Sequence, residues 1–355
     1  MKIIHTSDLH LGSPLSTKLK SDKLRERKRE RLSNFTRLCE EAKRVGAAAI
    51  IIAGDMFDSQ KISLRALDYT IDVIEKNKDI SFFYLAGNHE KSAVKDSGRA
   101  LPENLFLFGD DWTYYAIGDV VIAGRCEISD NIFDTLTLED NKKNIVVLHG
   151  ELRDRTKAPD AIGIKDAAER NIDYLALGHY HTHSAKKIDR RGVAVYSGTP
   201  EGRGFDEIGE MGYVLIDTDE AEARCYFVPF AKRQIHVVRV SADSLVRHSE
   251  LSERVEDALR GIPYEHLVRL EITGKRKLGF WIDTLSLERQ FEKRFYYFEI
   301  KDTTTLEINA DDYANDRSLK GEFIRLVMAE NNLSEEEKDK IILCGLNALL
   351  GEGEL

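Results

Sequence analysis

Six short motifs of the sequence gather side chains that can bind metal ions or transfer protons. The motifs are Asp8-Leu9-His10, Gly54-Asp55-Met56-Phe57-Asp58, Gly87-Asn88-His89-Glu90, His149-Gly150, Gly178-His179-Tyr180-His181 and Ser197-Gly198-Thr199-Pro200. Their carboxylates, imidazoles and amide offer oxygen and nitrogen donors without thiolate, a set that suits Mn²⁺, Fe²⁺ or Zn²⁺ better than Ca²⁺ or Mg²⁺ alone. Seven candidate ligands exceed what one ion needs. The motifs therefore favour two ions that share one carboxylate.

The spacing within the motifs supports this interpretation. In an extended segment, alternate residues share a face, so the Asp8/His10 and His179/His181 pairs point the same way. Taken singly, the motifs have ordinary explanations: Asp55 could cap a helix, and His149 could be a satisfied histidine at a strand end. Their ordered occurrence at successive strand ends favours a metal site.

An α/β pattern positions these motifs. Short apolar runs predict strands, and amphipathic stretches between the first of them predict helices. The strands are expected at 2–6, 47–53, 80–85, 119–124, 144–148, 174–177, 194–196 and 212–217, and the helices at 22–43 and 64–77. From about residue 230 a strand–helix–strand–helix–strand order follows, at 234–241, 249–261, 266–273, 282–294 and 296–301. Two further helices are expected at 319–330 and 335–350, the second opened by a capping box of Ser334 and Glu337.

The composition describes a globular chain of about two domains. Of 355 residues, 42% are hydrophobic and 32% charged, and no apolar run approaches the roughly 18 residues of a membrane span. Four widely separated cysteines predict a reducing cytoplasm and argue against a structural zinc knot.

The net charge of −10 argues, by itself, against a nucleic-acid partner. A local basic block argues the opposite. It consists of Lys18, Lys20, Lys23, Arg25, Arg27, Lys28, Arg29 and Arg31, interrupted by Asp22, Glu26 and Glu30. Because it directly follows the first metal motif, we expect it to hold phosphates beside the site. The alternative is a solvated helix face with internal ion pairs.

The motif series DLHLG, GDMFD, GNHE, LHG, GHYH and SGTP resembles the calcineurin-like metallophosphoesterases, and YSGTPEGRGFDEIGEMGYVLID is similar to their SbcD-type DNA-repair exonuclease branch. The resemblance implies a four-layer α/β/β/α sandwich with a small α+β capping domain and C-terminal helices. It divides the chain into a phosphoesterase domain at 1–232, a capping domain at 233–301, and a linker with partner-docking helices at 302–355. Glu90 departs from the aspartate of many relatives.

The resemblance also implies roles for individual residues. One metal ion would be held by Asp8, His10 and His181, the other by Asn88, His149 and His179, with Asp55 bridging them, and His89 would act as general acid. Mn²⁺ is the expected ion, with Fe²⁺, Zn²⁺ or Mg²⁺ as alternatives. Two such ions would lower the pKa of a shared water, and the resulting hydroxide would attack phosphorus. The predicted substrate contacts are Asp58, Arg25, Lys28, Arg29 and Arg203.

The implied function is that of the nuclease component of a metal-dependent DNA-processing complex. Its expected partners are DNA ends, an SbcC-like ABC-type ATPase with a coiled coil, and a second copy of the chain, without a membrane. Two alternatives stay open, because fold and metal site do not fix the substrate. One is a metallophosphoesterase acting on nucleotides or other small phosphoesters, and the other is a DNA-end binding protein with vestigial hydrolysis.

Overall fold

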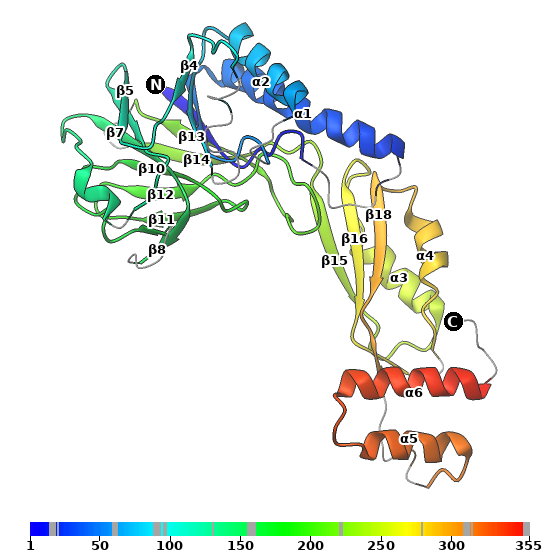
Figure 1. The fold of residues 1–355 in the computed structure, drawn as a ribbon. Helices are drawn as coiled ribbons and strands as arrows, with labels where there is room; N and C mark the ends of the chain where they lie inside the picture. The colour runs from blue at the N-terminus through cyan, green and yellow to red at the C-terminus, as the bar shows by residue number, and fades with distance from the viewer. Residues whose placement is uncertain are drawn as a thin grey trace. The chain divides into compact units, whose positions relative to one another are not determined.

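The computed structural model describes residues 1–13, 19, 21–58, 63–87, 94, 98–129, 131–154, 161–219, 223–277, 280–307, 313 and 315–350 (Figure 1). The chain forms two compact units, Met1–Ile235 and His236–Leu355. None of the described helices combines the length and apolar character that crossing a bilayer requires. All four cysteines lie in the described part of the chain, and none of them forms a disulfide there.

Two six-stranded sheets build the first unit. The first sheet has the order β14-β13-β1-β2-β3-β4, with β1 Lys2–Thr6, β2 Ala47–Ala53, β3 Ser81–Leu85, β4 Leu105–Leu107, β13 Gly212–Asp217 and β14 Arg224–Pro229. The second has the order β11-β12-β10-β7-β6-β5, with β5 Thr113–Ile117, β6 Val120–Gly124, β7 Lys143–His149, β10 Tyr174–Gly178, β11 Ser184–Lys187 and β12 Val193–Tyr196. The central strands of each sheet run parallel.

The two sheets pack face to face through a buried apolar core. Ile51 of β2 and Phe83 of β3 share this core with Val147 of β7 and Ala176 of β10. The side chains of parallel strands buried on both faces are apolar in nearly every position, and β2 has the sequence AAAIIIA.

Helices α1 (Ser21–Val45) and α2 (Leu64–Lys76) cover the outer face of the first sheet (Figure 1). In the described residues, the outer face of the second sheet is covered by the 3₁₀ turn η2 (Ile132–Thr135) and by loop segments, including the β8 (Glu151–Arg153) and β9 (Ala161–Gly163) pair. The predicted α/β fold is therefore confirmed, with α-helices outside the first sheet and, in the described residues, a 3₁₀ turn and loop segments in the layer outside the second.

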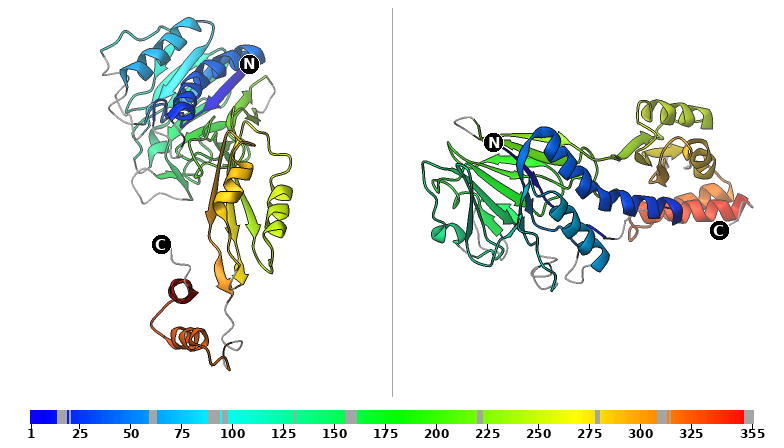
Figure 2. Two further views of the ribbon diagram at one scale, coloured as in Figure 1. Left: turned by 90° about the vertical axis from the view of Figure 1, so that its right-hand side faces the viewer. Right: turned by 90° about the horizontal axis from the view of Figure 1, so that it is seen from above.

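The second unit is an α+β assembly. Its sheet has the order β15-β16-β18, with β15 Ile235–Ser241, β16 Leu267–Thr273 and β18 Tyr297–Asp302. Alternate β16 residues Val268, Leu270 and Ile272 pack with α3 (His248–Ala258) and α4 (Thr284–Phe291), so both helices lie on one face of this sheet (Figure 2).

Two helices follow the short β17 (Lys275–Lys277) and β19 (Thr305–Glu307) pair. They are α5 (Leu319–Ala329) and α6 (Glu335–Leu350), which share a small apolar core with Leu306. The predicted capping box is confirmed, because the Ser334 amide donates to Glu337 at 2.8 Å and the Glu337 amide donates to Ser334 Oγ at 3.3 Å. The three-part domain division stays a prediction.

Candidate metal centre

The loops that follow β1 and β2 pair with each other beyond the ends of the strands. The Asp8 amide donates to the Gly54 carbonyl at 3.0 Å, and the His10 amide donates to the Asp55 carbonyl at 3.0 Å. Because β1 and β2 run parallel, their carboxyl ends meet at one edge of the sheet. This pairing places the side chains of Asp8, His10 and Asp55 at that edge.

The second sheet contributes histidines at the corresponding edge. His149 is the last residue of β7, and His179 directly follows β10. The His179 amide donates to both carboxylate oxygens of Asp8 at 3.2 Å. The site therefore lies where the carboxyl ends of both sheets meet.

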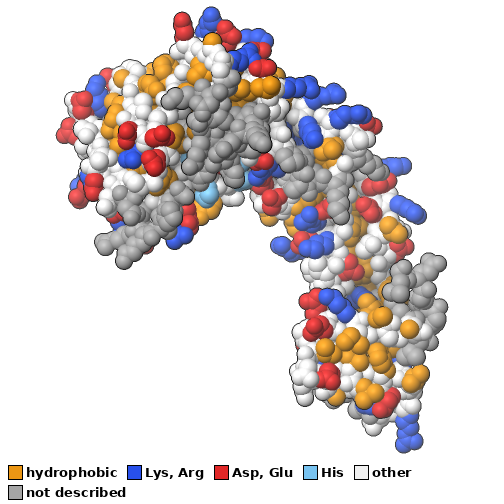
Figure 3. All heavy atoms as spheres, in the orientation of Figure 1, with side chains coloured by type: hydrophobic (Ala, Val, Ile, Leu, Met, Phe, Trp, Pro, Cys, Tyr) orange, Lys and Arg blue, Asp and Glu red, His pale blue; other side chains and the backbone are white. Residues whose placement is uncertain are grey.

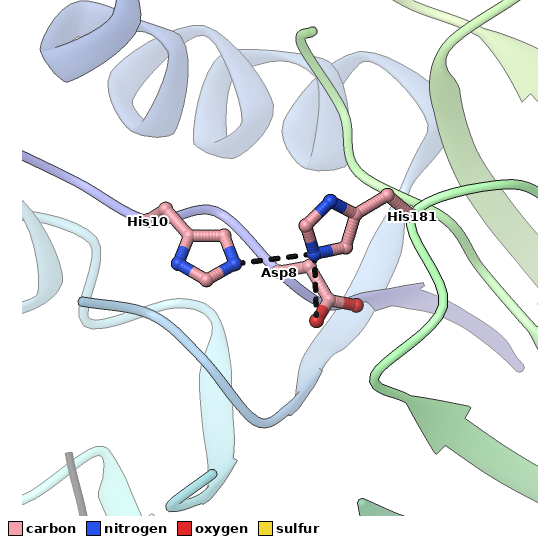
Figure 4. Close-up of side chains that lie close together, drawn as sticks. All are labelled: Asp8, His10 and His181. Atoms are coloured by element: carbon pink, nitrogen blue, oxygen red, sulfur yellow. Dashed lines mark hydrogen bonds and ion pairs between the residues drawn. The ribbon is translucent and has the colours of Figure 1, made fainter. Parts of the chain in front are cut away.

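Two groups of possible ligands share Asp8. Asp8, His10 and His181 form one group, and Asp8, Asp55 and His149 form the other; in each, the candidate ligand atoms lie within 4.8 Å of one another. In the first group, His181 Nε2 lies 3.3 Å from His10 Nε2 and 3.7 Å from Asp8 Oδ1 (Figure 4). Asp55 Oδ2 lies 3.3 Å from His149 Nε2 and 4.0 Å from His10 Nε2, so Asp55 reaches both groups.

The predicted ligands are only partly brought together. Asp8, His10, Asp55, His149 and His181 converge in the two groups. The imidazole of His179 belongs to neither group, although its ring centroid lies 5.5 Å from that of His149. The predicted ligand Asn88 and the predicted general acid His89 lie outside the described residues.

Three of the converging imidazoles have an oxygen atom close to Nδ1, the ring nitrogen that faces away from the other candidate ligands. His149 Nδ1 lies 2.9 Å from the Ala53 carbonyl, and His181 Nδ1 lies 2.6 Å from Glu207 Oε1. His10 Nδ1 lies 3.0 Å from Asp58 Oδ1. Because the oxygens beside His149 and His181 only accept, Nδ1 of these two rings carries a proton, and Nε2 is the nitrogen that faces the site.

This donor set fits a divalent metal. Nitrogen lone pairs and carboxylate oxygens face one another at 3.3 to 4.0 Å, an arrangement that is repulsive unless a cation or protons lie between them. Burial raises the pKa of Asp8, against the opposing effect of nearby histidines. Burial lowers the pKa of His149, but Asp55 and Asp8 outweigh it and raise the pKa to about 9. Both shifts reflect two carboxylates buried beside imidazoles, an arrangement that a divalent cation would stabilise.

Strained backbone accompanies the candidate ligands. Asp8, His10, Asp55 and His179 have φ values of +53°, +44°, +49° and +109°, in the region that side chains other than glycine rarely adopt. Such conformations cost about 1–3 kcal/mol each and persist where the surrounding structure imposes them. Because these conformations occur at the candidate ligands, we infer that they position the ligand side chains at a cost in the stability of the fold.

Close packing explains three glycines of the motifs. A Cβ on Gly54 would lie 2.0 Å from His149 Nδ1, and one on Gly87 would lie 2.0 Å from Asp55 Oδ1. A Cβ on Gly178 would lie 1.8 Å from the Ala53 carbonyl oxygen. Any side chain at these positions would therefore displace a candidate ligand or the backbone that carries it.

Comparison with known proteins agrees with this geometry. The family model described as calcineurin-like phosphoesterase matches residues 1–215. The chain belongs to this family. Members of the family are hydrolases of phosphoester bonds, so the two ligand groups are the candidate active site of a phosphoesterase.

Three curated proteins are similar to this chain over most of its length. The "Uncharacterized metallophosphoesterase YhaO" of Bacillus subtilis is 23% identical over 87% of this chain and 83% of its own length. The "DNA double-strand break repair protein Mre11" of Sulfurisphaera tokodaii is 24% identical over 96% of this chain and 92% of its own. A component of the nuclease SbcCD from Staphylococcus saprophyticus is 24% identical over 70% of this chain and 74% of its own.

Asp58 and Arg203, two predicted substrate contacts, hold each other and the histidines of the phosphoesterase site. Arg203 NH1 lies 3.3 Å from Asp58 Oδ1, and Arg203 Nε donates to Glu207 Oε1 at 2.8 Å. Arg203 NH2 also lies 3.3 Å from His181 Nδ1, but the shorter contact with Glu207 assigns the proton to that nitrogen. The contact of Asp58 and Arg203 with substrate stays a prediction.

The basic block divides into buried and exposed members. Arg25, Lys28 and Arg29 lie exposed on α1, where Figure 3 shows basic side chains gathered. The expectation that the whole block faces phosphates is wrong for Arg27 and Arg31, which are buried. Arg27 pairs with Glu201 at 2.6 Å, because a buried guanidinium needs a fixed partner. Lys18 and Lys20 lie outside the described residues.

Arg31 hydrogen-bonds to the strained loop that carries the candidate ligand His10. It donates to the His10 carbonyl at 3.0 Å, to Ser13 Oγ at 3.1 Å and to the Leu9 carbonyl at 3.4 Å. Burial lowers the pKa of Arg31 to about 10, with smaller effects from Arg27 and Arg203, and leaves it charged at neutral pH. Arg31 therefore fixes the backbone that presents His10.

Sequence reasoning placed Arg31 in a phosphate-binding block rather than behind the ligand loop, and it missed Glu207 as part of the site. Burial raises the pKa of Glu207, but His181 and Arg203 outweigh it and lower the pKa to about 2, so Glu207 is a carboxylate at neutral pH. The available signal was the position of Glu207 within the phrase that follows SGTP. Neither residue has the spacing of a metal ligand.

Proposed function

We propose that the chain is a metal-dependent DNA nuclease. The observation that carries the proposal is the pair of ligand groups that share Asp8, into which three imidazoles direct Nε2. Phosphodiester hydrolysis requires a site that binds divalent cations beside a negatively charged substrate. The similarity to a protein named Mre11 and to a component of the nuclease SbcCD supports DNA as that substrate.

Two divalent ions, expected to be Mn²⁺, would occupy the site. Asp8, His10 and His181 would hold one; Asp55 would bridge to the other, together with His149 and the motif residues Asn88 and His179. When bound, such a pair lowers the pKa of a water and offsets charge on the phosphoryl oxygens. The chain's own part is positional: Asp58, Glu207 and the Ala53 carbonyl orient the imidazoles. His89 would protonate the departing oxygen.

Exposed cations on α1 support a polymeric substrate. Lys23, Arg25, Lys28 and Arg29 are exposed and lie in the first turns of the helix that packs behind the ligand loop. Phosphates on either side of the scissile bond would attract them, and the attraction would weaken with salt.

A phosphoesterase acting on nucleotides or other small phosphoesters is the alternative. The same helix also exposes Asp22 and Glu26, and Arg25 pairs with Asp22. These acids reduce the positive field that a DNA backbone would meet. The similarity to a protein named only as a metallophosphoesterase is compatible with this alternative.

Helices α5 and α6 would dock an ATPase partner. Leu319 and Leu326 on α5 are 70% and 65% exposed, and Ile341 on α6 is 39% exposed, beside a core of few residues. Exposed apolar residues on a helix pair suit binding to another helical element. An SbcC-like ABC-type ATPase with a coiled coil, a homodimer and a cytoplasmic location complete the proposal.

The test is digestion of defined substrates with Mn²⁺ and with chelator. Single-stranded DNA, duplex ends and a small chromogenic diester are compared, using the chain and its Asp55→Asn variant. We expect Mn²⁺-dependent shortening of DNA that the variant lacks, and a much lower kcat/KM on the small diester. Hydrolysis of small phosphoesters without any cleavage of DNA would reject the nuclease and favour the alternative.

A further inference from the structure

A surface hollow of about 320 Å³ lies beside the candidate metal centre. It is lined by Leu152, Tyr180, Ser184, Ala185, Lys186, Ala194 and Tyr196. We propose that this hollow binds the base of a nucleotide next to the scissile phosphodiester, with the ring of Tyr180 as its stacking surface. The inference rests on the proposed nuclease function and assigns a subsite to it.

Tyr180 connects the hollow to the metal centre. It stands between His179 and His181 in the sequence, and its ring centroid lies 5.3 Å from that of His179. A nucleotide whose phosphate lies among the candidate ligands therefore has its sugar and base within reach of this ring.

The ring of Tyr180 is held in place by its neighbours but remains partly exposed to solvent. Its centroid lies 4.9 Å from that of Tyr196 at an interplanar angle of 72°, an edge-type contact. Tyr196 is itself fixed, because its hydroxyl donates to the Gly150 carbonyl at 2.8 Å and accepts from the Leu152 amide at 2.7 Å. Tyr180 nonetheless remains 43% exposed.

The remaining lining suits a flat ligand. Leu152, Ala185 and Ala194 supply small apolar surfaces, while Lys186 at the rim is 56% exposed and shares its charge with Asp154 at 3.0 Å. A nucleobase stacks on an aromatic ring whatever its identity, and a phosphate of the neighbouring nucleotide would attract the ammonium group. The expected ligand is therefore a nucleotide without base selectivity.

A purely structural Tyr180, supporting His179, is the competing explanation. The two explanations predict different results. If Tyr180 stacks on a base, removing that base from the substrate abolishes the effect of Tyr180→Ala on activity. If Tyr180 is structural, the effect remains. Oligonucleotides with a single abasic residue, placed in turn on either side of the scissile phosphate, measure this difference.

We expect Tyr180→Ala to lower kcat/KM on intact DNA by about 5- to 150-fold, the effect of losing one base–aromatic stack. Tyr180→Phe, which keeps the aromatic ring, should lose less activity than Tyr180→Ala. On one of the two abasic substrates, the wild type and Tyr180→Ala should agree within about twofold, since the stack is already absent. Tyr226→Ala, a half-exposed tyrosine on β14, is the matched control and should leave both substrates unaffected.

An equal loss on intact and both abasic substrates, or no loss on any, would overturn the subsite. Calorimetry with thymidine monophosphate and with 2-deoxyribose 5-phosphate separates this failure from that of the nuclease proposal. If DNA is not cleaved but Tyr180→Ala weakens only the nucleotide, the subsite stands and the nuclease proposal fails. Equal affinities of both ligands for both proteins would reject the subsite independently of cleavage.

Discussion

Glu207 offers a test of how the candidate site is positioned, because it contacts an imidazole without being a candidate ligand. Its Oε1 lies 2.6 Å from His181 Nδ1, and its other oxygen accepts from the Arg203 amide at 2.5 Å. Glu207→Gln keeps an acceptor oxygen of similar reach but removes the charge. His181 then loses a charge-assisted hydrogen bond, and Arg203 loses one of its two carboxylate partners.

The expected loss of Mn²⁺ affinity follows from the contact between Glu207 and His181. Charge-assisted hydrogen bonds are roughly twice as strong as neutral ones. Removing a partner that orients a ligating histidine typically weakens metal binding about 10- to 100-fold. We therefore expect the dissociation constant for Mn²⁺ to rise by this factor in Glu207→Gln, which corresponds to about 1.4–2.7 kcal/mol. Activity at saturating Mn²⁺ should fall much less.

The assay is calorimetric titration of Mn²⁺ into metal-free protein, paired with the Mn²⁺ dependence of hydrolysis. Glu210→Gln is the matched control, because Glu210 is an exposed carboxylate of the same loop. Unchanged Mn²⁺ affinity in Glu207→Gln, or an equal loss in Glu210→Gln, would show that the contact with His181 does not position a metal ligand.

Three further predictions concern the supports of the site and of the fold. Arg31→Met should weaken Mn²⁺ binding about tenfold, because the His10 loop loses its hydrogen bonds; unchanged calorimetry would contradict this. Gly178→Ala should lower the free energy of unfolding in urea by about 1–3 kcal/mol, since the added Cβ meets a carbonyl oxygen; an unchanged midpoint would count against it. Burial raises the pKa of Glu30, but Arg233 and Lys232 outweigh it and lower the pKa from its usual 4.5 to about 2. The stability it contributes is therefore complete above pH 4.5 and should decline between pH 4.5 and 2, more steeply than in Glu30→Gln.

The buried strands of the fold could be predicted from the sequence, and the sheet edges could not. Runs such as 47–53 and 144–148 are apolar because both faces of those strands are covered. The strands that were missed in the two six-stranded sheets are the four at their edges: β4, β5, β11 and β14. Edge strands need neither continuous apolar sequence nor length, and every residue of β11, SAKK, is exposed.

The candidate ligands could be predicted because metal binding restricts residue type and spacing. Their supports could not, because any donor or acceptor of suitable reach can orient a side chain. Arg27 and Arg31 belong to a charged run that suggests a solvated or phosphate-binding surface. Their burial depends on Glu201 and on loop carbonyls, and Glu201 is 174 residues from Arg27 in the sequence. Local charge patterns carry no information about such distant partners.

The metal content of the purified chain tests the central claim most directly. After saturation with Mn²⁺ and removal of free ions, elemental analysis should find two ions per chain, and fewer than two in Asp55→Asn. A stoichiometry of two in the wild type with a loss in the variant is the predicted result. One ion or none per chain, with full phosphodiester hydrolysis retained, would contradict the two-metal site built on Asp8 and Asp55.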